Sequence, residues 1–221
     1  MCFKAQINKL GILVNQHKSK MAKYPDNNDF QLWQQLKNGS ELALGKLIKK
    51  YFNLLQNYGY KFSKEEDFVK DCVQEVFIEI WNRQLTISQP ESVRAYLFSC
   101  IRKKVLRESF RQKIIKSDEI NDIENDMNFV DFSPELALIE QENINEMTQK
   151  VANLLNKLPK RQREAIYLRF YQNLERDEIA EVMNVNSQSV SNLLQVAFKT
   201  FRENWTELLL VILFQSNLLF K

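Results

Sequence analysis

Five polar side chains in the C-terminal part of the chain recur at helical spacing and could contact DNA. They are Gln188, Ser191, Asn192, Gln195 and Lys199. Their spacing places them along one side of a helix. Glutamine and asparagine amides can hydrogen-bond the edge of adenine in the major groove, and a lysine can contact phosphate. The alternative is an ordinary amphipathic hairpin in a helical bundle, so the elements that position these residues must be considered.

Three helices are expected between residues 158 and 202, and the five polar residues lie in the last of them. We expect the second helix to span residues 178–183 and the third to span about 188–201. Asn184 occupies the turn, where a positive φ is expected, and Ser187 is the expected N-cap of the third helix. A short helix, a tight turn and a longer amphipathic helix form a helix-turn-helix, whose last helix lies in the major groove.

A second set of candidate residues lies in the basic segment 91–116, which is predicted to form one long helix. Its aromatic residues Tyr96, Phe98 and Phe110 are interleaved with cationic ones. Such a combination suits an opened nucleic-acid strand, because cations follow phosphates and rings stack on unpaired bases. The alternative is a basic helix whose aromatic residues belong to the core. The cationic residues are Arg94, Arg102, Lys103, Lys104, Arg107, Arg111, Lys113 and Lys116, against a single later acid, Glu108.

The helix predicted over residues 63–83 has one apolar and one polar face. Its polar face carries Asp71, Gln74, Glu75 and Glu79. Two interpretations of this face stay open from the residues alone: a solvated surface, or a docking face for a basic or polar partner helix.

Composition favours an all-α protein of one large or two small domains. The chain has 221 residues, with only four Gly and four Pro. Its formal net charge of +3 conceals a segregation, since the segment 117–146 contains no Lys or Arg. That segment carries Asp118, Glu119, Asp122, Glu124, Asp126, Asp131, Glu135, Glu140, Glu142 and Glu146. Basic segments on both sides of an acidic one suit a polyanionic partner.

The sequence argues against catalysis. It shows no Gly-rich phosphate loop, metal triad or activated nucleophile, so we expect no enzyme activity, cofactor or metal. Cys2, Cys72 and Cys100 are too scattered for a zinc site and are expected to be thiols of a reducing cytoplasm. No secretory signal is expected.

We predict two small helical domains joined by an acidic linker. The N-terminal domain is expected over 29–116 and the C-terminal helix-turn-helix domain over 135–207, with the linker at 117–134. Residues 1–28 are expected to form a flexible arm, with Met1 and Met21 as alternative starts. The apolar tail 208–221 is too short to span a bilayer and is expected to pack on the C-terminal domain or to bind a partner.

Taken together, these segments resemble the sigma factors of bacterial RNA polymerase, specifically the compact extracytoplasmic-function group. The resemblance is carried by DCVQEVFIEIW at 71–81, YLFSCIRKKVLRESFR at 96–111 and LPKRQREAIYLRFYQNLERDEIAEVMNVNSQSVSNLL at 158–194. It implies binding to core polymerase through the β′ clamp and β flap, promoter recognition, DNA melting and transcription initiation. It also implies an anti-sigma factor, often membrane-bound in this family, and no small-molecule substrate.

The resemblance implies a role for each set of residues. Asp71, Gln74, Glu75 and Glu79 would contact the clamp. For the minus-ten element, the loop residues Ser88 and Gln89 would hold a flipped base, and Tyr96, Arg102, Lys103, Arg107 and Arg111 would bind the melted strand. For the minus-thirty-five element, Gln188, Ser191, Asn192 and Gln195 would face bases, and Arg163, Arg176 and Lys199 would hold phosphates. A helix-turn-helix regulator that acts without polymerase and a helical interaction protein stay as alternatives.

Overall fold

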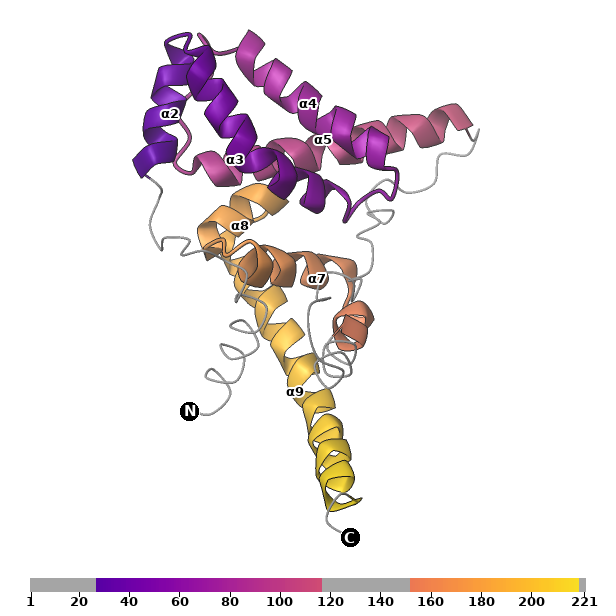
Figure 1. Cartoon of the computed structure of the whole chain (residues 1–221). Helices are drawn as coiled ribbons and strands as arrows, with labels where there is room; N and C mark the ends of the chain where they lie inside the picture. The colour runs from indigo at the N-terminus through magenta and orange to yellow at the C-terminus, as the bar shows by residue number, and fades with distance from the viewer. Residues whose placement is uncertain (1–26, 117–151, 219–221) are drawn as a thin grey trace. The chain divides into compact units, whose positions relative to one another are not determined.

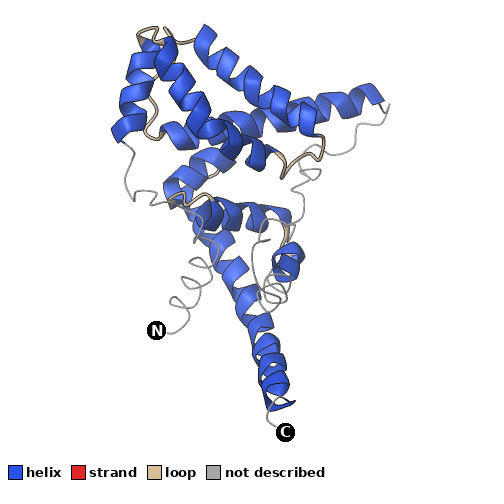
Figure 2. Ribbon diagram, in the orientation of Figure 1, coloured by secondary structure: helices blue, strands red, loops and turns tan. Residues whose placement is uncertain are grey.

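The computed structural model describes the backbone of residues 27–116 and 152–218 and the side chains of 28–112 and 152–203. These residues form helices joined by short loops, without a strand (Figure 2), so the all-α prediction is confirmed for the described part. The contacts group the helices before the gap in one compact unit and most of those after it in another. The predicted arm and linker lie almost wholly outside the described residues, so the predicted domain limits stay predictions.

Within residues 27–116, the first unit contains four helices (Figure 1): α2 (Asn27–Lys37), α3 (Glu41–Gly59), α4 (Glu66–Asn82) and α5 (Val93–Lys116). A short turn at Gly39 and Ser40 separates α2 from α3. Gly39 takes φ 84° there, and the hydroxyl of Ser40 accepts a hydrogen bond from the Ala43 N–H at 3.3 Å. These are a left-handed turn residue and an N-cap, the usual means of ending one helix and beginning the next.

The core of the first unit is aromatic and aliphatic. Trp33, Tyr58, Phe98 and Val105 are fully buried. The close approach of α3 to α4 requires a glycine, because a Cβ on Gly59 would lie 2.5 Å from Cγ1 of Val69. These contacts hold α4 and α5, the two helices with candidate functional residues, in a fixed relation within the unit.

Helix α4 begins later than its sequence pattern predicts. The predicted start at Ser63 is wrong, because α4 begins at Glu66 and Glu65 makes no side-chain cap. The Ser63 hydroxyl instead accepts a hydrogen bond from the Glu65 N–H at 3.2 Å, within the preceding loop. A serine of this kind stabilises a local turn as readily as a helix start, which explains the shift.

The second unit begins with helical residues 152–157 and continues with α7 (Lys160–Ile166), the π-helical segment η2 (Tyr167–Tyr171), α8 (Arg176–Met183) and α9 (Ser187–Leu218). Helix α7 packs against α9, and Leu168, Val190 and Ala197 are fully buried. The predicted end of α9 near residue 201 is wrong, since the helix runs on to Leu218. No helix in the described ranges combines the length and apolar character needed to cross a membrane.

Candidate nucleic-acid interface

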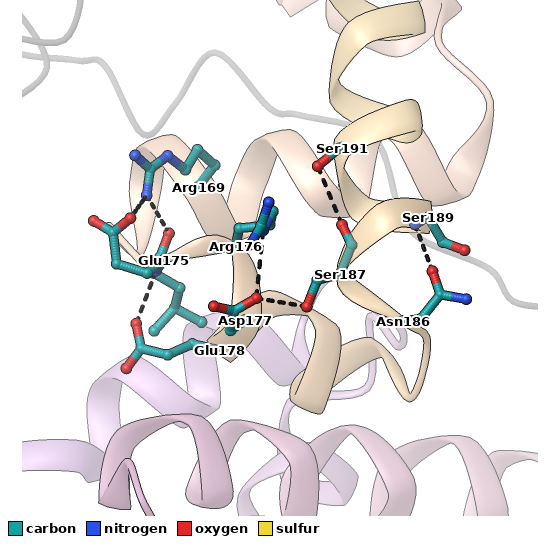
Figure 3. Close-up of polar contacts among 10 residues, drawn as sticks. Arg169, Glu175, Arg176, Asp177, Glu178, Asn186, Ser187, Ser189 and Ser191 are labelled. Atoms are coloured by element: carbon teal, nitrogen blue, oxygen red, sulfur yellow. Dashed lines mark hydrogen bonds and ion pairs between the residues drawn. The ribbon is translucent and has the colours of Figure 1, made fainter.

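Helices α8 and α9 and the turn between them form the predicted helix-turn-helix. Asn184 has φ 53°, which confirms the positive φ expected in the turn. The N-cap prediction is wrong by one residue, because Ser187 is already helical. The side-chain oxygen of Asn186 accepts from the Ser189 N–H at 2.7 Å (Figure 3). The Asn186 carbonyl accepts from the Val190 N–H at 3.3 Å. Asn186 is therefore the cap, a role for which Asn is as suitable as Ser.

Ser187 does not cap α9, and its side chain instead links the start of α9 to the start of α8. Its hydroxyl donates to the Asp177 carboxylate at 2.5 Å, and Arg176 Nε lies 3.3 Å from the same oxygen (Figure 3). The hydrogen bond from Ser187, together with the charge of Arg176, lowers the pKa of Asp177 below its usual value. The carboxylate therefore remains charged at neutral pH and joins the two helices at the protein surface.

A second cluster of polar contacts closes the turn before α8. Arg169 Nη1 donates to the Leu174 carbonyl at 2.8 Å and lies 2.8 Å from Glu175 Oε2. Glu178 accepts from the Glu175 N–H at 2.8 Å, which caps α8 (Figure 3). Asn173, beside this cluster, has φ 54°. The turn is thus fixed by side chains from η2, from the turn itself and from α8.

The side chains predicted to contact bases lie on α9, at its N-terminal end. Gln188, Asn192, Gln195 and Lys199 are exposed along one side, whereas Ser191 is half-buried. Gln188 Nε2 donates to Asn192 Oδ1 at 3.1 Å, and the Ser191 hydroxyl donates back to the Ser187 carbonyl at 3.2 Å. The amides of this face are therefore the groups that a base edge can reach, and Ser191 contributes less.

Of the three cations expected to hold phosphates near this face, one is placed differently. Arg176 and Lys199 are exposed, and Lys199 lies 3.9 Å from Glu203. Arg163 is only 7% exposed, and its Nη2 donates to the carbonyls of Asn156 and Leu158 at 2.9 and 3.1 Å. A buried guanidinium that holds two carbonyls is a structural group, so a phosphate contact by Arg163 does not fit its position.

Helix α5 presents a second cationic face. Lys103, Arg107 and Arg111 are exposed and follow one another at four-residue intervals, so they line one side of the helix. Arg107 and Arg111 lie 3.3 and 3.5 Å from the two oxygens of Glu108. Arg102, predicted for the same role, is only 6% exposed. Three of the four expected phosphate-binding cations therefore remain accessible to a nucleic-acid strand.

The loop between α4 and α5 is held by two residues of α2 that sequence reasoning missed. The indole N–H of Trp33 donates to the Ser88 carbonyl at 3.3 Å, and Gln34 Nε2 donates to Gln89 Oε1 at 2.6 Å. Trp33 also packs edge-to-face on Tyr96, with ring centroids 5.3 Å apart. No sequence signal identifies these contacts, because 55 residues separate each hydrogen-bonded pair.

Burial and contacts with Cys100 alter the chemistry of Tyr96. Desolvation, followed by the influence of the Cys100 thiol, raises the pKa of Tyr96 to about 12. The phenol therefore stays protonated at physiological pH and can act as a hydrogen-bond donor. Cys72, in the core under α4, has its pKa raised to about 11, mainly by burial. A buried thiol with a raised pKa stays protonated and is a poor nucleophile.

One side of α4 carries a stripe of exposed polar and apolar side chains, which we call the α4 outer face. It consists of Asp71, Gln74, Glu75, Ile78 and Glu79, all exposed. Ile78 is 57% exposed and was missed by sequence reasoning, although it falls four residues after Gln74 on the same side. An apolar side chain within a polar stripe is a common anchor of protein interfaces.

A buried lysine of α5 forms ion pairs with two glutamates of the α4 outer face. Lys104 Nζ lies 2.5 Å from Glu75 Oε2 and 2.8 Å from Glu79 Oε1. Its own side chain is only 9% exposed, and the two carboxylates are 55% exposed. Burial alone would lower the pKa of Lys104, but the hydrogen bonds that its ammonium donates to Glu75 and Glu79 raise it above its usual value. The buried ammonium is therefore charged and fixes both carboxylates in place.

In comparison with known proteins, two segments of the chain match two regions of one protein family. Residues 47–114 match the family described as Sigma-70 region 2, and residues 148–201 match Sigma-70, region 4. No curated protein matches the sequence significantly. Among solved structures, the fold is similar to that of CnrH, solved in complex with the cytosolic domain of CnrY. The TM-score is 0.53 at 20% identity, and the match covers 81% of this chain and 98% of that one.

A second similar structure is the sigma factor RpoE in complex with the anti-sigma factor NepR from Bartonella quintana. The TM-score is 0.52 at 18% identity, over 73% of this chain and 96% of that one. At this level of identity, both structures support the fold of the chain. The two family matches identify which segments of that fold are present here.

Proposed function

Because the chain belongs to the sigma-70 family of RNA polymerase sigma factors, we propose that three of its surfaces have separate roles. One binds core polymerase, the second binds the minus-ten element and the third binds the minus-thirty-five element. As a sigma factor it binds core RNA polymerase and directs promoter recognition and transcription initiation. The single observation that carries this function is the presence of region 2 followed by region 4 in one chain. The two regions match the compact organisation of the extracytoplasmic-function group, to which we assign the protein.

The α4 outer face is the proposed docking surface for the polymerase clamp. Gln74 and Glu75 supply hydrogen-bonding groups, and Ile78 between them and Glu79 supplies apolar contact area. Lys104 holds the two glutamates before the partner arrives. Side chains that are already ordered lose less conformational entropy on binding, which favours association.

For the minus-ten element, we propose that α5 and the preceding loop act together. Lys103, Arg107 and Arg111 line one side of α5 and would follow the phosphates of the melted strand. Ser88 and Gln89 lie in the loop before α5, where they would bind an extruded base. Extrusion costs a few kcal/mol, which stacking and hydrogen bonding in a protein site can offset.

For the minus-thirty-five element, we propose that α9 enters the major groove. Gln188, Asn192 and Gln195 would contact base edges, while Arg176 and Lys199 would contact phosphates. The Asp177–Ser187 hydrogen bond supports this role, because it sets the angle between α8 and α9 at the end that faces DNA.

An anti-sigma factor is the proposed regulatory partner. The similarity to RpoE, which was solved in complex with one, supports this proposal. We further propose that the protein works in the cytoplasm, where core polymerase and promoter DNA are located, and that its anti-sigma factor is held at the membrane. The partner is expected to cover surfaces that polymerase requires.

The decisive experiment is in vitro transcription with cognate core polymerase and a promoter library. Addition of the protein is expected to give promoter-directed transcripts that core polymerase alone does not give. The double variant Gln74→Ala, Glu75→Ala is expected to reduce affinity for core polymerase by about tenfold or more, as loss of interface anchors does. A regulator that acts without polymerase would give no promoter-directed transcripts and would be indifferent to this variant.

A matched control uses exposed amides away from the proposed surface. Asn53→Ala with Asn57→Ala alters exposed residues of α3 and is expected to leave polymerase affinity unchanged. Thermal unfolding is measured in parallel, because Glu75→Ala also removes one ion-pair partner of Lys104. Equal loss of binding in both double variants would contradict the assignment of the docking surface.

A further inference from the structure

The loop that precedes α5 contains an amide whose orientation is set from another helix. Gln34, on α2, donates its Nε2 hydrogen to Gln89 Oε1 at 2.6 Å. The acceptor end of the Gln89 amide is thereby engaged by α2. Its donor end, Nε2, is buried and has no hydrogen-bond partner among the described residues. An unsatisfied buried donor in a candidate binding loop is unusual and calls for a functional explanation.

Neighbouring contacts fix the backbone at the same place. The buried indole of Trp33 donates to the Ser88 carbonyl at 3.3 Å, so consecutive residues of α2 hold consecutive residues of the loop. Ser88 itself is exposed, as are Leu85 and Thr86. The loop is therefore held by α2 at Ser88 and Gln89, while the side chains of Leu85, Thr86 and Ser88 are exposed.

We propose that Gln34 is a specificity-determining residue for the minus-ten element, acting through the orientation of the Gln89 amide. This inference rests on the proposed function of the loop as the site of an extruded base. Because Gln34 engages the Gln89 oxygen, the N–H donors of this amide are the groups left for a base to meet. A donor that meets the exocyclic group of a base can pair with O6 of guanine or O4 of thymine, but not with the amino group of adenine or cytosine. An entering base that displaces the atoms covering Gln89 Nε2 then supplies the acceptor that this group lacks.

The proposal makes a reversal of specificity possible. In Gln34→Glu, the new carboxylate can only accept, so Gln89 must turn its amide and donate Nε2 to it. Gln89 then presents Oε1 where it formerly presented Nε2. The loop changes from a hydrogen-bond donor to an acceptor, and its preferred base changes from a keto to an amino base.

The test is sequencing of transcripts from a library randomised across the minus-ten element, with the full-length protein and cognate core polymerase. Wild-type protein is expected to favour a keto base at one position, and Gln34→Glu is expected to shift the keto-to-amino ratio there by about tenfold, the scale of one well-made base contact. Gln34→Met, which removes the hydrogen bond without imposing an orientation, is expected to reduce discrimination at that position without reversing it.

Two further variants separate the possible failures. Gln35→Glu introduces the same charge at the next residue of α2, which is exposed, and is expected to leave the preference unchanged. Gln89→Met is expected to abolish the preference. If Gln89→Met changes the preference but Gln34→Glu does not, the role of Gln34 is refuted and the loop assignment survives.

If Gln89→Met changes no minus-ten position while the wild-type protein still initiates transcription, both the loop assignment and the role of Gln34 are refuted, and the sigma-factor function stands. A thermal unfolding midpoint within about 2 °C of wild type for each variant confirms that a change in preference does not come from loss of the fold.

Discussion

Neighbouring cations of the same kind have different roles because one of each pair is buried. Lys104 and Arg163 lie inside their units, where they hold carboxylates and carbonyls respectively. Lys103, adjacent to Lys104 in sequence, and Arg161, two residues before Arg163, are both exposed. A buried charge is retained only where partners compensate its desolvation, so the two buried cations support structure and the exposed ones are available to phosphate.

Arg163 is expected to contribute to stability and not to DNA affinity. Arg163→Met removes two hydrogen bonds from a charged donor and is expected to lower the free energy of unfolding by about 2 kcal/mol. Arg161→Met, at an exposed site, is expected to change stability by less than about 0.5 kcal/mol. Urea unfolding measures both. If Arg163→Met stays folded with unchanged stability but binds promoter DNA more weakly, the phosphate contact predicted from the sequence would be supported after all.

Lys104 gives the first unit a distinct dependence on alkaline pH. Its pKa is raised in the folded state, so its ion pairs stabilise fully below the usual lysine pKa and are lost as pH rises through the raised value. Lys104→Met is expected to lower the free energy of unfolding by about 1 to 2 kcal/mol near pH 8. The difference from wild type should shrink as the pH rises above the usual lysine pKa of about 10.4. A difference that stays constant with pH would assign the effect to packing of the lysine stem.

At the scale of elements, local signals in the sequence predicted left-handed turn residues better than the exact ends of helices or the contacts between them. The turn at Gly39 and the left-handed Asn184 follow from residue type, since few residues adopt positive φ. The start of α4 and the cap of α9 were misplaced because Ser and Asn each stabilise several local geometries. The contacts of Gln34 with the loop and of Lys104 with α4 depend on packing between distant helices, which periodicity alone does not encode.

The turn of the helix-turn-helix can be tested through its backbone. Asn184 has φ 53°, a conformation in which a Cβ costs about 1 to 2 kcal/mol and which Asn and Gly tolerate best. Asn184→Ala is expected to lower the free energy of unfolding by about 1 kcal/mol, whereas Asn184→Gly should remain within a few tenths of wild type. Equal values for the two variants in urea unfolding would show that the turn relaxes to negative φ.

At the scale of the whole molecule, the chain combines two helical units that carry separate candidate DNA surfaces. The faces of α5 and α9 belong to different family regions, and each is organised by contacts within its own segment. The basic character of residues 91–116 and the pattern of 158–202 made both surfaces predictable from the sequence. Which cations on them are accessible was not predictable, because accessibility depends on tertiary burial.

Separate surfaces predict independent energetic effects. Lys103→Met with Arg107→Met alters the α5 face, and Gln188→Ala with Asn192→Ala alters the α9 face. Because the two pairs share no partner, the combined variant is expected to lose promoter affinity by the product of the separate losses, within about 0.5 kcal/mol. Promoter binding by reconstituted holoenzyme measures this. A combined loss no greater than the larger single loss would mean that one surface acts only after the other.

The length of α9 has a practical consequence for handling the protein. Its 32 residues extend about 48 Å at 1.5 Å per residue, whereas a major groove is about 12 Å wide. The far end of α9, coloured yellow in Figure 1, therefore lies well beyond the width of the groove that its first turns are proposed to enter. A fluorophore attached near Leu218 would be tens of ångströms from the proposed base contacts, so labelling there is expected to spare promoter recognition.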